Sequence, residues 1–126
     1  MNTAKNPIHS QSILFFIFGG TGDLTSRKLV PALYNLFLDG WMPSNFKIIG
    51  LGRTQQTDDQ FRDLLLEGIN NFSRSGKAAD KKWKAFAAHV EFQIADINEE
   101  KAYQEIGEHI KKSGDEWKSD PCVIYY

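Results

Sequence analysis

The 126-residue sequence predicts an α/β fold, a doubly wound parallel sheet with helices on both faces. Three observations favour this class. Short apolar segments alternate with longer segments of helical periodicity, in the order strand, helix, strand, helices, strand, helix, strand. The first apolar segment, residues 13–18, contains no polar position, which is typical of a strand buried on both faces. That segment runs directly into a glycine-rich turn, and a helical pattern follows.

Composition and charge exclude several classes of protein. With 41% hydrophobic residues, 25% charged residues and a formal net charge of -1, the chain lacks the basic excess that nucleic-acid binding needs. The single Cys122 excludes an internal disulfide and fits a reducing compartment, and the scattered histidines predict no metal site. No apolar run approaches the roughly 20 residues of a membrane span. We therefore expect a cytoplasmic protein with a disordered tail at 1–11 and one domain at 12–126.

The first helix is expected to follow the glycine turn and to end at Asp39-Gly40, where Gly40 is a natural C-cap. Pro31 lies inside this pattern and either kinks the helix or breaks it into two, and the sequence leaves both open. The residues expected on the buried face share helical spacing: Leu24, Leu29, Leu33, Leu36 and Phe37.

Residues 46–51 predict the second strand, followed by the turn Gly52-Arg53-Thr54. Thr57 and Gln60 form a capping-box pattern that opens the next helix, and residues 73–77 read as a loop. Apolar residues at helical spacing are expected on the inner face of that helix: Phe61, Leu64, Leu65, Ile69 and Phe72.

A further helical face, Trp83, Phe86 and Ala87, precedes a strand at 90–94 whose apolar and polar residues alternate. Such alternation is typical of a half-exposed strand and predicts an edge position. The low polarity of the last strand, 122–126, favours a central position instead. Together these features predict the strand order 3-2-1-4 of a Rossmann-like domain.

The last helix is expected to begin at Asn98, a good N-cap, and to end at Ser113-Gly114. Residues at helical spacing on its predicted buried face are Tyr103, Ile106 and Ile110.

The glycine turn carries the first functional signal. Gly19-x-x-Gly22-x-x-Thr25 is a variant of the glycine fingerprint that brings a dinucleotide pyrophosphate to a helix N-terminus. A P-loop does not fit, because the Gly-Lys-Ser/Thr ending is missing. The glycines of this turn allow the backbone to approach such a ligand closely, because no Cβ obstructs it.

Arg53 is the second signal, because it follows the second strand, where an acidic residue would bind a ribose 2′-hydroxyl and an arginine a 2′-phosphate. We therefore expect Arg53 and Thr54 to select NADP, with NAD as an alternative, since a single arginine tolerates it. Lys28 lies near the phosphate turn and is either a ligand contact or a solvated charge. Asp96 and Ile97 follow the third strand, where Asp96 either contacts the coenzyme or caps the next helix.

Residues 18–33, FGGTGDLTSRKLVPAL, closely resemble the N-terminal motif of glucose-6-phosphate dehydrogenases. Similar to that family as well are Asp39-Gly40, residues 49–54 (IGLGRT) and residues 123–126 (VIYY). Thr25 and Ser26 depart from the usual alanine and lysine, and we expect them to alter helix packing without abolishing binding. The resemblance covers about residues 12–126. It implies that the coenzyme turn is lined by Gly19, Gly20, Thr21, Gly22, Asp23 and Leu24, that Arg53 with Thr54 meets the 2′-phosphate, and that Lys28 matches a basic position near the nicotinamide.

The resemblance implies oxidation of glucose 6-phosphate to 6-phosphogluconolactone in the pentose phosphate pathway, with hydride transfer to NADP or NAD. It implies that substrate-binding and catalytic residues lie beyond residue 126, in a larger domain. This chain then has no catalytic residue and is an inactive coenzyme-binding fragment of a homodimer or homotetramer. The alternative function is a non-catalytic NADP-sensing module related to atypical short-chain dehydrogenases, which share Gly-Gly-Thr-Gly turns.

Overall fold

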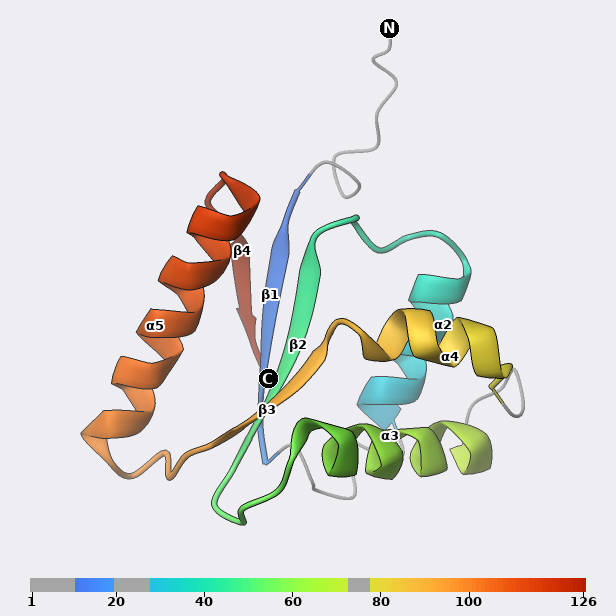
Figure 1. Cartoon of the computed structure of the whole chain (residues 1–126), viewed down its shortest axis with the longest axis horizontal. Helices are drawn as coiled ribbons and strands as arrows, with labels where there is room; N and C mark the ends of the chain where they lie inside the picture. Colours follow the sequence, from blue (N-terminus) through green and yellow to red (C-terminus); the bar gives the residue numbers. More distant parts are fainter. Residues whose placement is uncertain (1–10, 20–27, 73–77) are drawn as a thin grey trace, which may run out of the picture.

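The computed structural model describes residues 11–19, 28–72 and 78–126, and Figure 1 shows how their elements are arranged. Four parallel strands form a sheet in the order β3-β2-β1-β4, which confirms the predicted 3-2-1-4 order. The strands are β1 (Ile13–Phe18), β2 (Phe46–Gly52), β3 (Val90–Ile94) and β4 (Cys122–Tyr125).

Helices cover both faces of the sheet, as predicted. Figure 1 shows α5 on one face and α2, α3 and α4 together on the other. The helices are α2 (Val30–Leu38), α3 (Asp58–Phe72), α4 (Asp80–Ala87) and α5 (Glu100–Trp117).

Each face of the sheet has its own core, because successive side chains of a strand point to opposite faces. Ile17 and Ile48 pack with Phe61 of α3 on one face. Phe16 and Ile49 pack with α5 on the other. β1 is apolar throughout because both of its faces are covered, which is why residues 13–18 carry no polar position, whereas β2 carries one polar side chain, Lys47.

Local signals at α2 and α3 are confirmed. The Thr57 N–H donates to Gln60 Oε1 at 2.8 Å, the Gln60 N–H donates to Thr57 Oγ1 at 3.1 Å, and α3 begins at the next residue, Asp58. Gly40 follows the C-cap of α2 with φ +80°, a conformation that favours glycine. Pro31 lies in the first turn of α2, where its missing N–H costs no intrahelical bond, and the two residues before α2, Lys28 and Leu29, are π-helical. The earlier part of the predicted helix lies outside the described residues, so the choice between a kink and a break at Pro31 is not tested.

The predicted ends of the last helix are wrong. Glu99, not Asn98, is the N-cap of α5, and the helix runs through Ser113-Gly114 to Trp117 before Lys118 adopts φ 54°. Ser113 is buried and Trp117 packs against the core on the α5 face of the sheet, which outweighs the cost of about 1 kcal/mol for Gly114 inside the helix. Tyr103 was expected on the buried face and is 57% exposed, because Ala102 occupies that face instead.

Two apolar residues of the other helices are also more exposed than predicted. Leu36 of α2 is 43% exposed and Phe72, the last residue of α3, is 47% exposed. The helical spacing is correct in both helices, but the sheet covers only part of each apolar stripe. Loop 73–77 lies outside the described residues, and so does Leu24.

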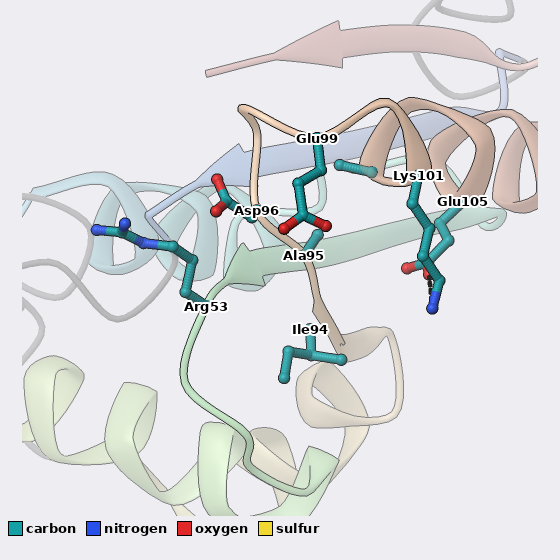
Figure 2. Close-up of a pocket in the computed structure, with 8 residues that line it drawn as sticks. Arg53, Ile94, Ala95, Asp96, Glu99, Lys101 and Glu105 are labelled. Atoms are coloured by element: carbon teal, nitrogen blue, oxygen red, sulfur yellow. Dashed lines mark ion pairs between the residues drawn. The ribbon is translucent and has the colours of Figure 1, made fainter.

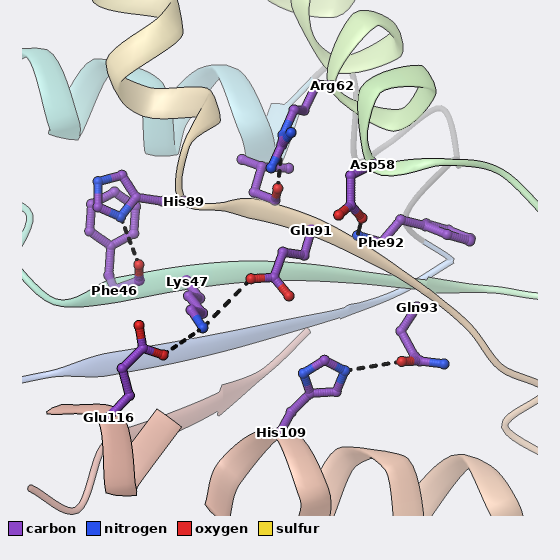
Figure 3. Close-up of polar contacts among 11 residues, drawn as sticks. Phe46, Lys47, Asp58, Arg62, His89, Glu91, Phe92, Gln93, His109 and Glu116 are labelled. Carbon is purple, nitrogen blue, oxygen red and sulfur yellow. Dashed lines mark hydrogen bonds and ion pairs between the residues drawn. The ribbon is translucent and has the colours of Figure 1, made fainter. Parts of the chain in front are cut away.

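β3 is an edge strand, as predicted, and α3 protects its outer edge (Figure 3). The Phe92 N–H donates to Asp58 Oδ1 at 2.7 Å, and Arg62 Nε donates to the Val90 carbonyl at 3.0 Å. Side chains of α3 therefore satisfy backbone groups that an edge strand would otherwise offer to another chain.

The polar residues of β3 face α5. Lys47 lies 3.6 Å from Glu91 and 3.2 Å from Glu116 of α5, and His109 Nε2 donates to Gln93 Oε1 at 3.1 Å (Figure 3). The alternation along β3 thus reflects polar contact with α5 as well as partial exposure.

The last strand stands beside β1, as the predicted order 3-2-1-4 requires. β4 pairs with β1 and forms the second edge, with Cys122 exposed and Tyr125 53% exposed. Tyr125 stacks on Phe16 of the neighbouring strand, with ring centroids 5.7 Å apart. Part of the low polarity of β4 is thus accounted for by aromatic packing against β1.

Candidate functional site

A cavity of about 380 Å³ lies at the carboxyl ends of β1, β2 and β3. Its walls come from three separate parts of the chain because parallel strands end at the same edge of a sheet. The lining residues are Gly19, Leu51, Gly52, Arg53, Thr54, Ala95, Asp96, Ile97 and Asn98. Five of the predicted coenzyme residues therefore meet here: Gly19, Arg53, Thr54, Asp96 and Ile97.

Gly19 directly follows β1 and starts the glycine turn. Its φ is +69°, in the left-handed region that favours glycine, and its N–H donates to the Leu51 carbonyl at 2.9 Å. This bond ties the start of the turn to the end of β2. The remaining predicted turn residues lie outside the described residues: Gly20, Thr21, Gly22, Asp23 and Leu24.

Arg53 is exposed at the end of β2 and also lines a second cavity, of about 340 Å³, with Asp96 and Glu99 (Figure 2). Its guanidinium points away from Lys101 and Glu105, which pair with each other at 3.9 Å. Within the described part of the chain no carboxylate forms an ion pair with Arg53. The guanidinium is therefore free to meet an anion.

The turn between β3 and α5 forms the opposite wall. Asp96 Oδ1 accepts the N–H of Asn98 at 2.9 Å, which closes a local turn two residues long. Asp96 is therefore not the cap of α5, and its carboxylate both fixes the turn and faces the cavity. Ile97 presents a side chain that is 47% exposed, an apolar surface beside Arg53.

Lys28 is exposed two residues before α2 and lines neither cavity. Leu51, Gly52, Ala95 and Asn98 line the main cavity and were not singled out from the sequence. Their positions at the ends of predicted strands were the available signal. Leu51, Gly52 and Ala95 offer a coenzyme no charged or polar side chain, and the amide of Asn98 was interpreted only as a helix cap.

The two described histidines belong to the packing between helices and sheet. His89 stacks on Phe46 with ring centroids 3.8 Å apart, and its Nδ1–H donates to the Phe46 carbonyl at 2.8 Å. Burial lowers the pKa of His89, against the opposing effect of this bond, and burial also lowers the pKa of His109. Neither lines a cavity described above.

Over residues 11–19, 28–72 and 78–126, no three His, Cys, Asp or Glu side chains gather closely enough to hold a metal ion. In the same ranges no helix is both long enough and apolar enough to cross a membrane.

A parallel sheet in this order, a glycine turn after β1 and a cavity across three strand ends define a dinucleotide-binding α/β domain. A family model described as "Glucose-6-phosphate dehydrogenase, NAD binding domain" matches residues 16–126. The chain belongs to this family of glucose-6-phosphate dehydrogenase coenzyme domains, whose ligand is a nicotinamide coenzyme.

Individual relatives agree with this assignment. Glucose-6-phosphate 1-dehydrogenase of Leuconostoc mesenteroides is 33% identical over 113 residues, covering 90% of this chain and 22% of the relative. The enzyme of the same name from Chlamydia muridarum is 32% identical over 110 residues, covering 87% of this chain and 22% of the relative. These matches favour the first of the two functions that the sequence predicted.

Solved structures show the same likeness. A glucose-6-phosphate dehydrogenase in complex with glucose 6-phosphate superposes with a TM-score of 0.84 at 25% identity, covering 97% of this chain and 25% of that one. The glucose-6-phosphate 1-dehydrogenase of Mycobacterium avium gives a TM-score of 0.72 at 27% identity, covering 90% of this chain and 23% of that one. The chain thus spans about a quarter or less of the length of these proteins.

Proposed function

We propose that this chain supplies the coenzyme site of an NADP-dependent glucose-6-phosphate dehydrogenase, which oxidises glucose 6-phosphate to 6-phosphogluconolactone. The family match and the names of the relatives support the reaction. The observation that carries the choice of NADP is Arg53, exposed at the end of β2 with no ion pair to any described carboxylate. A guanidinium matches a phosphate group in geometry and charge.

The described residues fit such a coenzyme. The positive φ of Gly19 lets the chain turn away after β1, the Arg53 guanidinium suits a 2′-phosphate, and Ile97 offers apolar surface to a flat ring. Thr54 and Asp96 complete the proposed contacts in the cavity, with Lys28 and Gly20 to Leu24 proposed for the phosphate side. When bound, the nicotinamide accepts the hydride removed from the sugar.

We assign sugar binding and catalysis to protein outside residues 12–126, because the chain spans about a quarter or less of its relatives' length. The isolated chain is then expected to bind coenzyme and to be inactive. Association into a dimer or tetramer is likewise proposed for the whole enzyme. A cytoplasmic location stays a prediction from the sequence.

Calorimetric titration of the 126-residue chain with NADP and with NAD tests this function. Arg53→Ala should weaken NADP binding about tenfold or more, the loss expected for a hydrogen bond to a charged group. NAD binding should change by less than about threefold, because NAD offers no 2′-phosphate to the guanidinium.

Lys82→Ala is the matched control, since Lys82 is an exposed cation on α4 that lines neither cavity. It should leave both affinities unchanged. Equal losses of NADP and NAD affinity in Arg53→Ala would contradict the role of Arg53 at the 2′-phosphate. Absence of saturable binding of either dinucleotide to the unmodified chain would overturn the proposed function itself.

A further inference from the structure

Tyr103 has a position that packing does not explain. It lies on the first turn of α5, it is 57% exposed, and its hydroxyl donates to the Ile97 carbonyl at 2.9 Å. An exposed aromatic side chain gains little from burial, so the hydrogen bond is the contact that gives it direction. The acceptor belongs to the turn that forms one wall of the coenzyme cavity.

Other bonds fix the residues on either side of Ile97. The Ala95 N–H donates to the Gly52 carbonyl at 2.8 Å, and the Asn98 N–H donates to Asp96 Oδ1 at 2.9 Å. The Ile97 side chain is 47% exposed and so is held only weakly by packing. The Tyr103 hydroxyl therefore completes the set of bonds that determines where Ile97 stands.

We propose that Tyr103 is a positioning residue for coenzyme binding: its hydroxyl holds the Ile97 wall against the adenosine half of the dinucleotide. This inference rests on the proposed function. Ile97 and Arg53 line the same cavity, and the 2′-phosphate assigned to Arg53 belongs to the adenosine half. Tyr103 thus acts on the coenzyme through Ile97 and does not line the cavity itself.

Tyr103→Phe removes only the hydroxyl. Calorimetry should show NADP and adenosine 2′,5′-bisphosphate both bound about three- to tenfold more weakly, the range produced by loss of one neutral hydrogen bond. The two factors should be equal, because the two ligands share the adenosine half. A role confined to helix stability would instead lower the melting temperature and leave both affinities unchanged well below it.

Tyr34→Phe is the matched control. The Tyr34 hydroxyl is buried against α4 and has no hydrogen-bond partner among the described residues, so its removal should leave both affinities unchanged. Unchanged affinities in Tyr103→Phe, with wild-type binding intact, would overturn the inference alone. A wild-type chain that binds neither NADP nor NAD would overturn the proposed function and this inference with it.

Discussion

A single methyl group added at Gly50 should lower the free energy of unfolding of the chain. It lies in the middle of β2, buried under the ring of Phe61 from α3. A Cβ built on Gly50 would stand 2.8 Å from Phe61 Cε2 and closer still to Cζ, whereas real Cβ contacts essentially never fall below 3.0 Å. Gly50→Ala therefore requires the ring or the backbone of β2 to move.

The ring of Phe61 has little room to move. It is fully buried, and Phe92 packs beside it with ring centroids 5.4 Å apart. Overpacking of this kind costs about 1–3 kcal/mol, of which the better strand propensity of alanine returns roughly 0.5–1 kcal/mol. With an unfolding entropy of about 2.1 cal/mol/K per residue, each lost kcal/mol lowers the melting temperature by about 4 °C in a chain of this length.

Thermal and urea unfolding followed by circular dichroism measure the effect. Gly107→Ala is the matched control, because Gly107 lies in α5 with nothing within 4 Å of a built Cβ. There the same substitution should raise the free energy of unfolding by about 0.5–1 kcal/mol. If Gly50→Ala proved as stable as wild type, the close approach of Phe61 to β2 would be refuted.

Two further predictions concern stability. Thr57→Ala should lower the free energy of unfolding by about 1 kcal/mol in urea titrations, because it breaks the reciprocal bonds with Gln60, and an unchanged midpoint would contradict that role. Burial lowers the pKa values of His89 and His109 from 6.5, so below about pH 6.5 the unfolded chain binds more protons. The stability that these two histidines contribute as neutral groups should be complete above that pH and should be lost as the pH falls. The urea midpoint should therefore change less between pH 7.5 and 5.5 in His109→Gln than in the wild-type chain. An equal change in the two proteins would refute the assignment.

Much of the fold could be predicted because its signals are local. The apolar run of β1 and the capping box before α3 each depend on only a few neighbouring residues. The ends of α5 depend on burial against the sheet, which no local pattern records, so Gly114 inside the helix was mistaken for its end. The place of β4 beside β1 was predicted from the order of the elements, and the stacking of Tyr125 on Phe16 accounts for part of its low polarity.

The candidate site could be predicted only in part, for a related reason. Arg53, Asp96 and Ile97 were found because each follows a strand and carries a chemical feature that a coenzyme could use. Tyr103 was taken for a core residue because its spacing matches the buried face, whereas its role in the structure comes from one hydroxyl bond. Periodicity records which face a residue occupies and does not record what its polar atom contacts.

The placement of the cavity walls also depends on contacts far from any motif. Asp58 and Arg62, one turn apart on α3, bind the backbone of β3 at Phe92 and Val90. These bonds join α3 to the outer edge of β3, while pairing with β2 sets the register that brings Ile94 opposite Gly52. Ala95, which follows Ile94, begins one wall of the cavity, and Arg53, which follows Gly52, belongs to the other wall. The pairing of β2 with β3 therefore sets the separation of the two walls of the cavity, and the polar contacts of α3 hold β3 from its outer side.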